Sequence, residues 1–215
     1  MIKLADKYHC TGCAACAQSC GHDAISMQTD NEGFLQPIID TTKCVECGLC
    51  QKHCPELQPI ERLGYEQQKY YALIYDHDRK ISSSGGAFSV FAKWIISQSG
   101  IVYGATINEK FEVKHIGVES TEELSKLRGS KYVQSIIGDT YKKIRNHLRT
   151  NRKVLFVGTG CQVGGLYAFL NGKRYDGLLY TLDLVCHGTP SYGAFKSYIS
   201  KLEKTDSPNG ELGSI

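Results

Sequence analysis

Apolar and polar residues change their spacing several times along the chain, and these changes predict most of its regular elements. From residue 70 onward, short apolar runs alternate with helical patterns and glycine-rich turns. Strands are expected at 70–75, 101–107, 111–118, 153–157 and 178–185, and helices at 87–100, 139–150 and 192–204. Such alternation is typical of a partly parallel sheet that helices cover.

Polar segments and glycines mark the expected breaks between these elements. A polar turn is expected at 76–80, and a capping box at Ser120 and Glu123 predicts a short helix through Leu127. The glycine-rich stretch 158–165 is expected to be the turn into the following helix.

The segment 81–86 is a serine and glycine loop that opens directly onto the helix expected from residue 87. The helix has its apolar residues at helical spacing, namely Ala87, Val90, Phe91, Trp94 and Ile95. Glycines allow close backbone approach, and first-turn N–H groups and hydroxyls are donors, so the loop suits a phosphate. A helix that merely has a serine cap is the open alternative, and the local sequence alone favours it.

A second possible anion site lies in the segment 129–132, Gly-Ser-Lys-Tyr. It follows Arg128, which is expected to be exposed. Alone, this loop is a weak indication of anion binding.

In the first 57 residues, cysteines recur instead of apolar residues. Two runs of one spacing, C-x2-C-x2-C-x3-C, comprise Cys10, Cys13, Cys16 and Cys20, and then Cys44, Cys47, Cys50 and Cys54. A tight loop brings three thiolates to three corners of a 4Fe-4S cube, whereas the fourth ligand must come from farther away. Cys54 is therefore expected to complete the first site and Cys20 the second. Their constant register indicates an internal duplication with a pseudo-two-fold axis.

Two other uses of these cysteines fit the spacing less well. Structural zinc sites usually come as paired C-x2-C knuckles, not triplets. A disulfide framework suits a shorter secreted chain, and the first ten residues contain no apolar leader segment. We therefore expect a reducing, cytoplasmic compartment.

The cysteine runs and the later alternation together predict two domains. An α+β ferredoxin-like dicluster domain at 1–57 would be followed by a linker at 58–69 and an α/β domain with a partly parallel sheet at 70–215. Within the first domain, a helical turn is expected at 23–27 and a short hairpin at 33–39.

Net charge and hydropathy limit the kinds of partner that are expected for this chain. Eight thiolates and two oxidised cluster cores would lower the formal charge of +3 to about −1, so charge predicts no nucleic-acid partner. No apolar run reaches the roughly 18 residues of a membrane span.

Two further cysteines, Cys161 and Cys186, follow expected strands, at the rim of a sheet where ligands gather. Either could be a nucleophile, but His187 is not evidently a base for its neighbour Cys186. The glycines at 158 and 160 faintly resemble a dinucleotide fingerprint, which we reject because the third glycine is misplaced. The more economical interpretation is that these two cysteines supply half of the ligands of a third 4Fe-4S cluster.

Several stretches together resemble the beta-subunit family of coenzyme F420 hydrogenases and dehydrogenases, and the likeness spans nearly the whole chain. They are the two cysteine runs and the segments 84–89, 129–132, 158–162 and 183–188. The chain is most similar to the bacterial branch found with polysaccharide-biosynthesis genes. The resemblance implies an iron-sulfur flavoprotein, in which FAD exchanges a hydride with a deazaflavin and passes electrons singly through the clusters.

The resemblance also implies roles for individual residues. The implied flavin-site residues are Ser84, Gly85, Gly86, Gly129, Ser130, Lys131 and Tyr132. Cys161 and Cys186 would be ligands of a third 4Fe-4S cluster. No side chain is expected to act as an acid or base, because orientation and cluster spacing do most of the work.

Two departures from the family weaken this transfer. Gly160 stands where the family usually has proline, and after a turn at 209–210 the chain stops where a strand would start. The family continues with another C-x2-C pair, so we expect a truncated product or a fragment, which would lack the third cluster.

The sequence therefore predicts an electron-transfer oxidoreductase subunit with two 4Fe-4S clusters and FAD, together with a redox partner protein and a hydride-carrying small molecule. The alternative is a non-enzymatic ferredoxin-like carrier or adaptor that docks a partner enzyme. A polysaccharide-modifying transferase has no sequence motif behind it.

Overall fold

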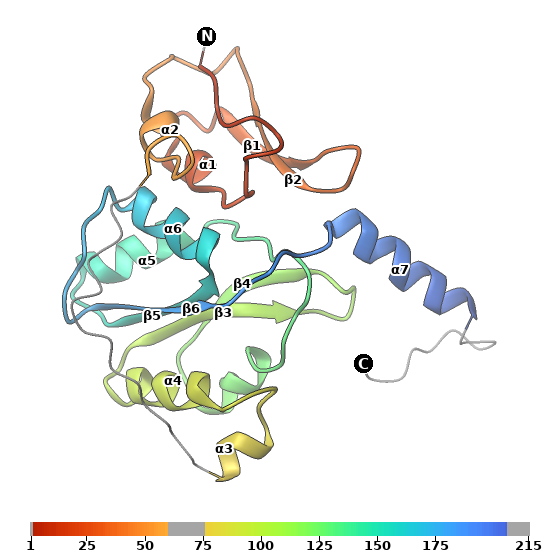
Figure 1. Ribbon diagram of the computed structural model, residues 1–215. Coiled ribbons are helices and arrows are strands. Elements are labelled where there is room, and N and C mark those ends of the chain that lie inside the picture. Colours follow the sequence, from red (N-terminus) through yellow and green to blue (C-terminus); the bar gives the residue numbers. More distant parts are fainter. Residues whose placement is uncertain (1, 60–75, 206–215) are drawn as a thin grey trace.

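The computed structural model describes residues 2–59 and 76–205, which form a dicluster part and an α/β part (Figure 1). The strand expected at 70–75, most of the expected linker and the turn at 209–210 lie outside the described residues. In Figure 1 the dicluster part lies above helices that cover one face of the sheet.

The dicluster part is built from two short helices and one hairpin. Its elements are α1 (Ala15–Ser19), β1 (Ile25–Thr29), β2 (Leu35–Ile39) and α2 (Leu49–Lys52). β1 and β2 pair antiparallel, from Ile25 opposite Ile39 to Thr29 opposite Leu35. The Asp30 carboxylate accepts hydrogen bonds from the N–H groups of Glu32 and Phe34 and closes the turn.

The helical turn expected at 23–27 is wrong, because most of that segment is strand β1. The physical reason is the partner strand: β2 offers a full antiparallel ladder, which a short isolated turn of helix cannot match.

The backbone repeats the internal duplication seen in the cysteines. Gly12 and Glu46 both have positive φ, 66° and 55°, and so do Ala14 and Gly48, 62° and 76°, which precede α1 and α2. Each pair occupies equivalent places in the two cysteine runs. Left-handed residues turn the chain tightly between ligands, which a loop around a cluster requires.

The α/β part has a four-stranded sheet in the order β4-β3-β5-β6. The strands are β3 (Ile101–Ile107), β4 (Val113–Val118), β5 (Val154–Thr159) and β6 (Leu179–Leu184). β3, β5 and β6 run parallel, and β4 is antiparallel to β3. The prediction of a partly parallel sheet after a dicluster domain is confirmed.

Helices cover both faces of this sheet (Figure 1). α5 (Thr140–Arg149) and α6 (Gly160–Phe169) lie on one face and α4 (Ala87–Ser97) on the other. The remaining helices are α3 (Asp76–Lys80), the 3-10 helix η1 (Glu122–Lys126) and α7 (Tyr192–Thr205), which extends away from the sheet (Figure 1). Tyr103 and Phe156 pack in a core with α5 and α6, whereas Val102 and Leu155 pack with α4 on the other face. Strand alternation thus gives each face its own apolar core.

Three local expectations differ from the structure. Residues 76–80 form helix α3 instead of a polar turn. The glycine-rich stretch from residue 160 is the first turns of α6, because Gln162 accepts the Thr159 N–H and starts the helix. The segment after Ser120 is a 3-10 helix, and the Glu123 carboxylate accepts from the N–H of Glu119, not of Ser120.

Helix α4 forms as expected but buries a different face. Ser89, Ala92 and Ile95 are buried, whereas Phe91 and Trp94 remain 41% and 42% exposed. Ser89 is buried because its hydroxyl accepts a hydrogen bond from Arg128, 3.1 Å away.

Candidate metal centres and the carboxyl edge of the sheet

The two cysteine runs surround two separate hollows in the dicluster part, each with about 350 Å³ of space that is partly open to solvent. The first hollow is lined by Cys10, Cys13, Cys16 and Cys54, and the second by Cys20, Cys44, Cys47 and Cys50. The fold therefore brings the cysteines together in two crossed sets, each with three ligands from one run and one from the other.

The four thiols of each set are spread around a hollow. Within residues 2–59 and 76–205, no three His, Cys, Asp or Glu side chains converge on one point that could hold a metal ion. Tetrahedral zinc draws all its ligands onto one ion. A 4Fe-4S cube binds each thiolate at a different iron, so four thiols spread around a hollow fit it.

Burial makes these thiols weak acids in the absence of metal. Desolvation raises the pKa of Cys13 to about 11 and that of Cys16 to about 12, although the N–H groups of Ala15 and Ala17 stabilise the thiolates. Iron must therefore displace these protons on binding. The same N–H groups would then point at cluster sulfurs, where they help to set the reduction potential.

The two hollows differ in what surrounds them. We call the hollow of Cys10, Cys13, Cys16 and Cys54 the inner site, because Ala14 and Ala15 beside it are buried in the core shared with α5 and α6. We call the other hollow the outer site. Its ligand Cys47 is exposed, and so are its apolar neighbours Val45 and Leu49, 58% and 42%.

Cys161 and Cys186 lie at the carboxyl ends of neighbouring parallel strands. Thr159 of β5 pairs with Leu184 of β6, and each cysteine comes two residues after its strand partner. Cys161 is partly buried, and its sulfur lies 3.1 Å from the Thr159 hydroxyl, whereas Cys186 is exposed. The sheet thus places both cysteines just beyond the carboxyl ends of its parallel strands, a region that we call the carboxyl edge.

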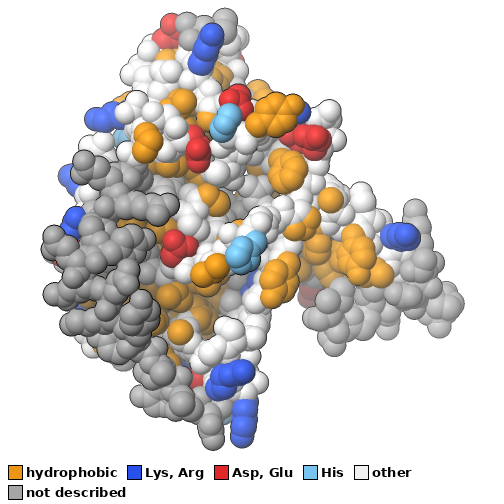
Figure 2. Space-filling view, in the orientation of Figure 1, with side chains coloured by type: hydrophobic (Ala, Val, Ile, Leu, Met, Phe, Trp, Pro, Cys, Tyr) orange, Lys and Arg blue, Asp and Glu red, His pale blue; other side chains and the backbone are white. Residues whose placement is uncertain are grey.

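Apolar side chains surround Cys186 on the surface. Leu184 and Val185 are 48% and 90% exposed, and Figure 2 shows apolar groups gathered where β6 leads toward α7.

The two expected flavin loops, 84–86 and 129–132, come together near this edge. The N–H of Ser130 donates to the Ser83 hydroxyl, 3.1 Å away. Gly86 precedes α4 with a φ of 86°, and no side chain caps that helix N-terminus. Helix α4 ends next to the start of β3, so the helix and the strand run in opposite directions. The first turn of α4 therefore lies toward the carboxyl ends of the parallel strands (Figure 1).

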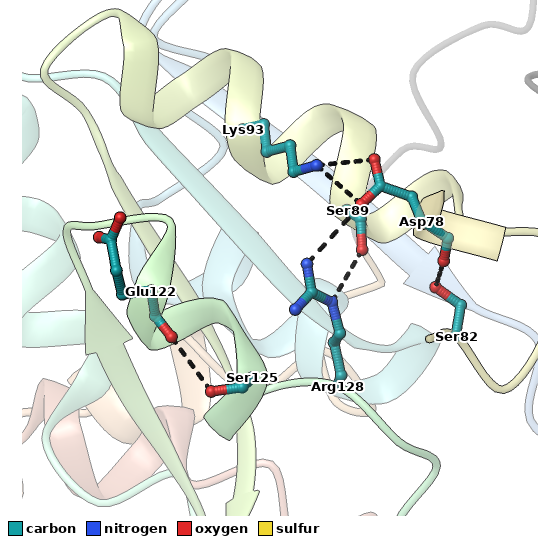
Figure 3. Close-up of polar contacts among 7 residues, drawn as sticks. All are labelled: Asp78, Ser82, Ser89, Lys93, Glu122, Ser125 and Arg128. Atoms are coloured by element: carbon teal, nitrogen blue, oxygen red, sulfur yellow. Dashed lines mark hydrogen bonds and ion pairs between the residues drawn. The ribbon is translucent and has the colours of Figure 1, made fainter. Parts of the chain in front are cut away.

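Three charged side chains lie together next to these loops (Figure 3), and we call them the Asp78 charged group. The Asp78 carboxylate, 8% exposed, lies 2.7 Å from the Lys93 ammonium and 3.8 Å from the Arg128 guanidinium. Arg128 also donates to Ser89. The expectation that Arg128 is exposed is wrong, since its side chain is 17% exposed and held by these partners.

Lys131 and Tyr132 of the second loop differ in their surroundings. The Lys131 ammonium donates to the carbonyl oxygens of Leu127 and Arg128 just after η1, and burial lowers its pKa to about 8. The Tyr132 side chain is 82% exposed. Lys131 thus caps a helix end in this structure, while Tyr132 is open to a ligand.

Comparisons with known families agree with this geometry. Residues 9–56 match a 4Fe-4S dicluster domain, and a second dicluster model matches residues 36–109. Residues 151–209, which contain both edge cysteines, match the C terminus of the coenzyme F420 hydrogenase/dehydrogenase beta subunit. The C-terminal part of this chain is therefore similar to the beta subunit of coenzyme F420 hydrogenases and dehydrogenases.

The individual relatives of this chain are distant. The coenzyme F420-dependent sulfite reductase of Methanocaldococcus jannaschii is 24% identical over 98% of this chain, which spans 37% of that protein's length. A chain in the F420-reducing NiFe hydrogenase complex of Methanosarcina barkeri superposes with a TM-score of 0.47 and 20% identity, over 60% of this chain and 47% of that one. None of the described helices is long and apolar enough to cross a membrane.

Several residues that support these sites were not expected from sequence. Gln18, Asp78 and Gly165 each act across long sequence separations, and no local motif marks them. The serine-rich loop beside Asp78 was the nearest available signal.

Proposed function

We propose that this chain is an iron-sulfur electron-transfer subunit that relays electrons between a hydride carrier in its α/β part and two 4Fe-4S clusters. The observation that carries the proposal is the pair of crossed four-cysteine hollows, one of them packed directly against the α/β part. The inner and outer cysteine sets would each hold one cluster.

The hydride carrier is proposed to be FAD bound at the loops 84–86 and 129–132. Their donors suit phosphate groups: the uncapped N-terminus of α4, the exposed Ser84 and the exposed Ser130. Tyr132 offers an aromatic face for stacking. A bound flavin supplies the exchange between two-electron hydride chemistry and single electrons.

In this proposal, the chain's own residues orient the bound flavin and clusters and shield them from solvent. Asp78, Lys93 and Arg128 hold the two loops in place, and the Gly86 conformation exposes the first-turn N–H groups of α4. Cys161 and Cys186 would be two ligands of a third cluster only where a longer chain supplied the other two, as the family resemblance implies, so two clusters are proposed for this chain. No side chain is assigned a proton transfer.

The partners follow from the same arrangement. A small hydride carrier of the deazaflavin class, such as the coenzyme F420 named for the relatives, would approach the carboxyl edge. A redox partner protein would exchange electrons at the outer site, where Cys47 is exposed. Eight cluster thiols favour a reducing compartment such as the cytoplasm.

The first experiment is to purify the chain anaerobically and to measure iron, sulfide and extractable flavin per polypeptide. About eight irons with one FAD are expected. About eight irons without flavin, even after incubation with FAD, would instead favour the ferredoxin-like carrier or adaptor. A chain full of clusters and flavin that passes no electrons from any hydride donor to a dye acceptor would contradict the proposal.

A further inference from the structure

Helix α6 of the α/β part lies directly behind a ligand of the inner site. Gly165 is buried in this helix, and a Cβ atom at this position would lie 2.9 Å from the Cβ and 3.1 Å from the sulfur of Cys13. It would also lie 2.9 Å from the Tyr141 hydroxyl. Cβ atoms in proteins essentially never approach other heavy atoms to 2.9 Å, and 3.1 Å is also unusually tight, so position 165 favours glycine strongly.

The neighbouring glycine on the same helix is different. A Cβ atom at Gly164 would have no other atom within 4 Å apart from its own chain neighbours. The close approach is therefore a property of position 165 and not of the glycine-rich helix as a whole.

Other contacts fix the dicluster part at this place. The Gln18 side chain accepts hydrogen bonds from the N–H groups of Tyr141 and Lys142 at 2.8 and 3.1 Å, and Gln134 donates to the carbonyl of Thr11 at 3.0 Å. Because these bonds come from separate elements, the sulfur of Cys13 has little freedom to move away from α6.

Tyr141 links the inner site to the carboxyl edge. Its hydroxyl donates to the carbonyl of Gln162 at 2.8 Å, and its side chain is fully buried. Burial raises its pKa well above the usual range, and the nearby sulfurs of Cys13 and Cys161 add to the rise. Tyr141 thus lies close to a ligand of the inner site and to an edge cysteine.

We propose that Gly165 is a positioning residue for the inner 4Fe-4S site, because its missing side chain lets Cys13 pack against α6 and the Tyr141 hydroxyl. This inference rests on the proposed cluster binding. The dry packing and the hydroxyl dipole would then tune the potential of the inner cluster but not that of the outer one. Gly165 and Tyr141 would thereby hold Cys13, a ligand of the inner site, against the α/β part, where a bound flavin would supply single electrons.

The test compares Gly165→Ala with the matched control Gly164→Ala in the full chain. Alanine favours helix at both positions, so a loss in Gly165→Ala cannot come from helix propensity. Iron content and the midpoint potential of each cluster would be measured by EPR-monitored redox titration. A Cys47→Ser variant, which alters the outer cluster, would assign the two signals.

We expect Gly164→Ala to match the wild type. In Gly165→Ala, the inner cluster should either lose its iron or show a ratio of reduced to oxidised cluster changed about threefold or more at the wild-type midpoint, while the outer cluster stays the same. Equal iron content and equal potentials in both variants would overturn the inference. A wild-type chain that binds no iron would instead overturn the proposed function.

Should Gly165→Ala fail to fold, Tyr141→Phe decides, because it keeps the ring and removes only the hydroxyl. A shift confined to the inner potential would support the inference. Potentials of both clusters equal to those of the wild type would overturn it.

Discussion

Gln18 joins the two parts of the molecule with a single side chain. Its amide oxygen accepts from the second and third N–H groups of α5, those of Tyr141 and Lys142, and the adjacent Asp139 makes no side-chain cap. The helix in one part is thus capped by a residue from the other. First-turn N–H groups have no partner within their own helix, so this acceptor is needed for both structure and docking.

We expect Gln18→Ala to lower the free energy of unfolding by about 1–3 kcal/mol, because two N–H groups near the buried interface lose their acceptor. Urea unfolding followed through Trp94, the only tryptophan in the chain, would measure the loss. The control is Gln28→Ala, which removes an exposed amide bonded only to Ser26 at the surface. Equal midpoints for both variants would show that the cap contributes nothing.

His115 is a second buried residue with a defined role. Its Nε2 lies 3.0 Å from the carbonyl of Val157 and its Nδ1 3.0 Å from the Ser135 hydroxyl, to which Gln162 also donates. The neutral ring with the proton on Nε2 satisfies both contacts. Desolvation lowers its pKa from 6.5 to about 4, and the charge of Lys131 adds to the effect.

This pKa predicts how stability depends on pH. Above pH 6.5, the ring is neutral in the folded and the unfolded chain, and its stabilisation is fully present. Between about pH 6.5 and 4 the unfolded chain binds a proton that the folded chain refuses, so the free energy of unfolding should fall by about 3 kcal/mol. Urea midpoints across this range, with iron content checked at each pH, should fall less steeply in His115→Gln. Parallel slopes would contradict the assignment.

At the scale of elements, sequence patterns found the strands of the four-stranded sheet and the longer helices, but not strand β1 or helix α3, nor the contacts that each element makes. The glycine-rich start of α6 resembled a turn, because a glycine that makes room for Cys13 looks the same in sequence as one that breaks a helix. The cysteine spacing was more informative, since it is itself a geometric constraint on a cluster. Contacts such as Gln18 with α5 span more than 100 residues and leave no local pattern.

The buried face of α4 shows the same limit. Periodicity favoured Phe91 and Trp94 for the core, yet Ser89 is buried because Arg128 reaches it from beyond η1. A polar partner from a distant element thus overrode the apolar pattern. Elements were predictable from local sequence, whereas their orientation depended on long-range partners.

The Asp78 charged group, which consists of Asp78, Lys93 and Arg128, links α3, α4 and the segment after η1. We therefore expect Asp78→Asn to loosen both candidate flavin loops. Loss of the carboxylate leaves Lys93 and Arg128 without their anion and should cost about 1–3 kcal/mol of stability. Flavin affinity, measured by fluorescence titration, should fall as well. Glu123→Ala is the matched control, because it breaks a surface pair with Lys126. Unchanged flavin affinity in Asp78→Asn would show that the Asp78 charged group does not support the flavin site.

At the scale of the whole molecule, the two duplicated cluster sites have acquired different surroundings. The backbone around them is nearly equivalent, with left-handed residues at Ala14 and Gly48. The inner site, however, is covered by α6, while the outer site keeps an exposed ligand in Cys47. The outer site, which has the more exposed ligand, is therefore the more accessible of the two to another protein, and a relay through this module would be directional.

This asymmetry predicts the order in which the clusters are lost. Solvent reaches Cys47, Val45 and Leu49 at the outer site, whereas α6 backs Cys13 at the inner one. Brief treatment of the loaded chain with an oxidant and an iron chelator should therefore remove about half of the iron first, from the outer site. Alkylation followed by mass spectrometry would then label the outer set, Cys20, Cys44, Cys47 and Cys50, before the inner set.

The same experiment on Gly165→Ala distinguishes two causes of this order. If packing against α6 protects the inner cluster, the variant should lose both clusters at similar rates, and Gly164→Ala should keep the wild-type order. If the order persists in Gly165→Ala, protection comes from the dicluster part itself, through residues such as Met27 and Pro37 that line the inner hollow. Simultaneous loss in the wild-type chain would show that the two sites are equally accessible, and the directional relay would then have no structural basis.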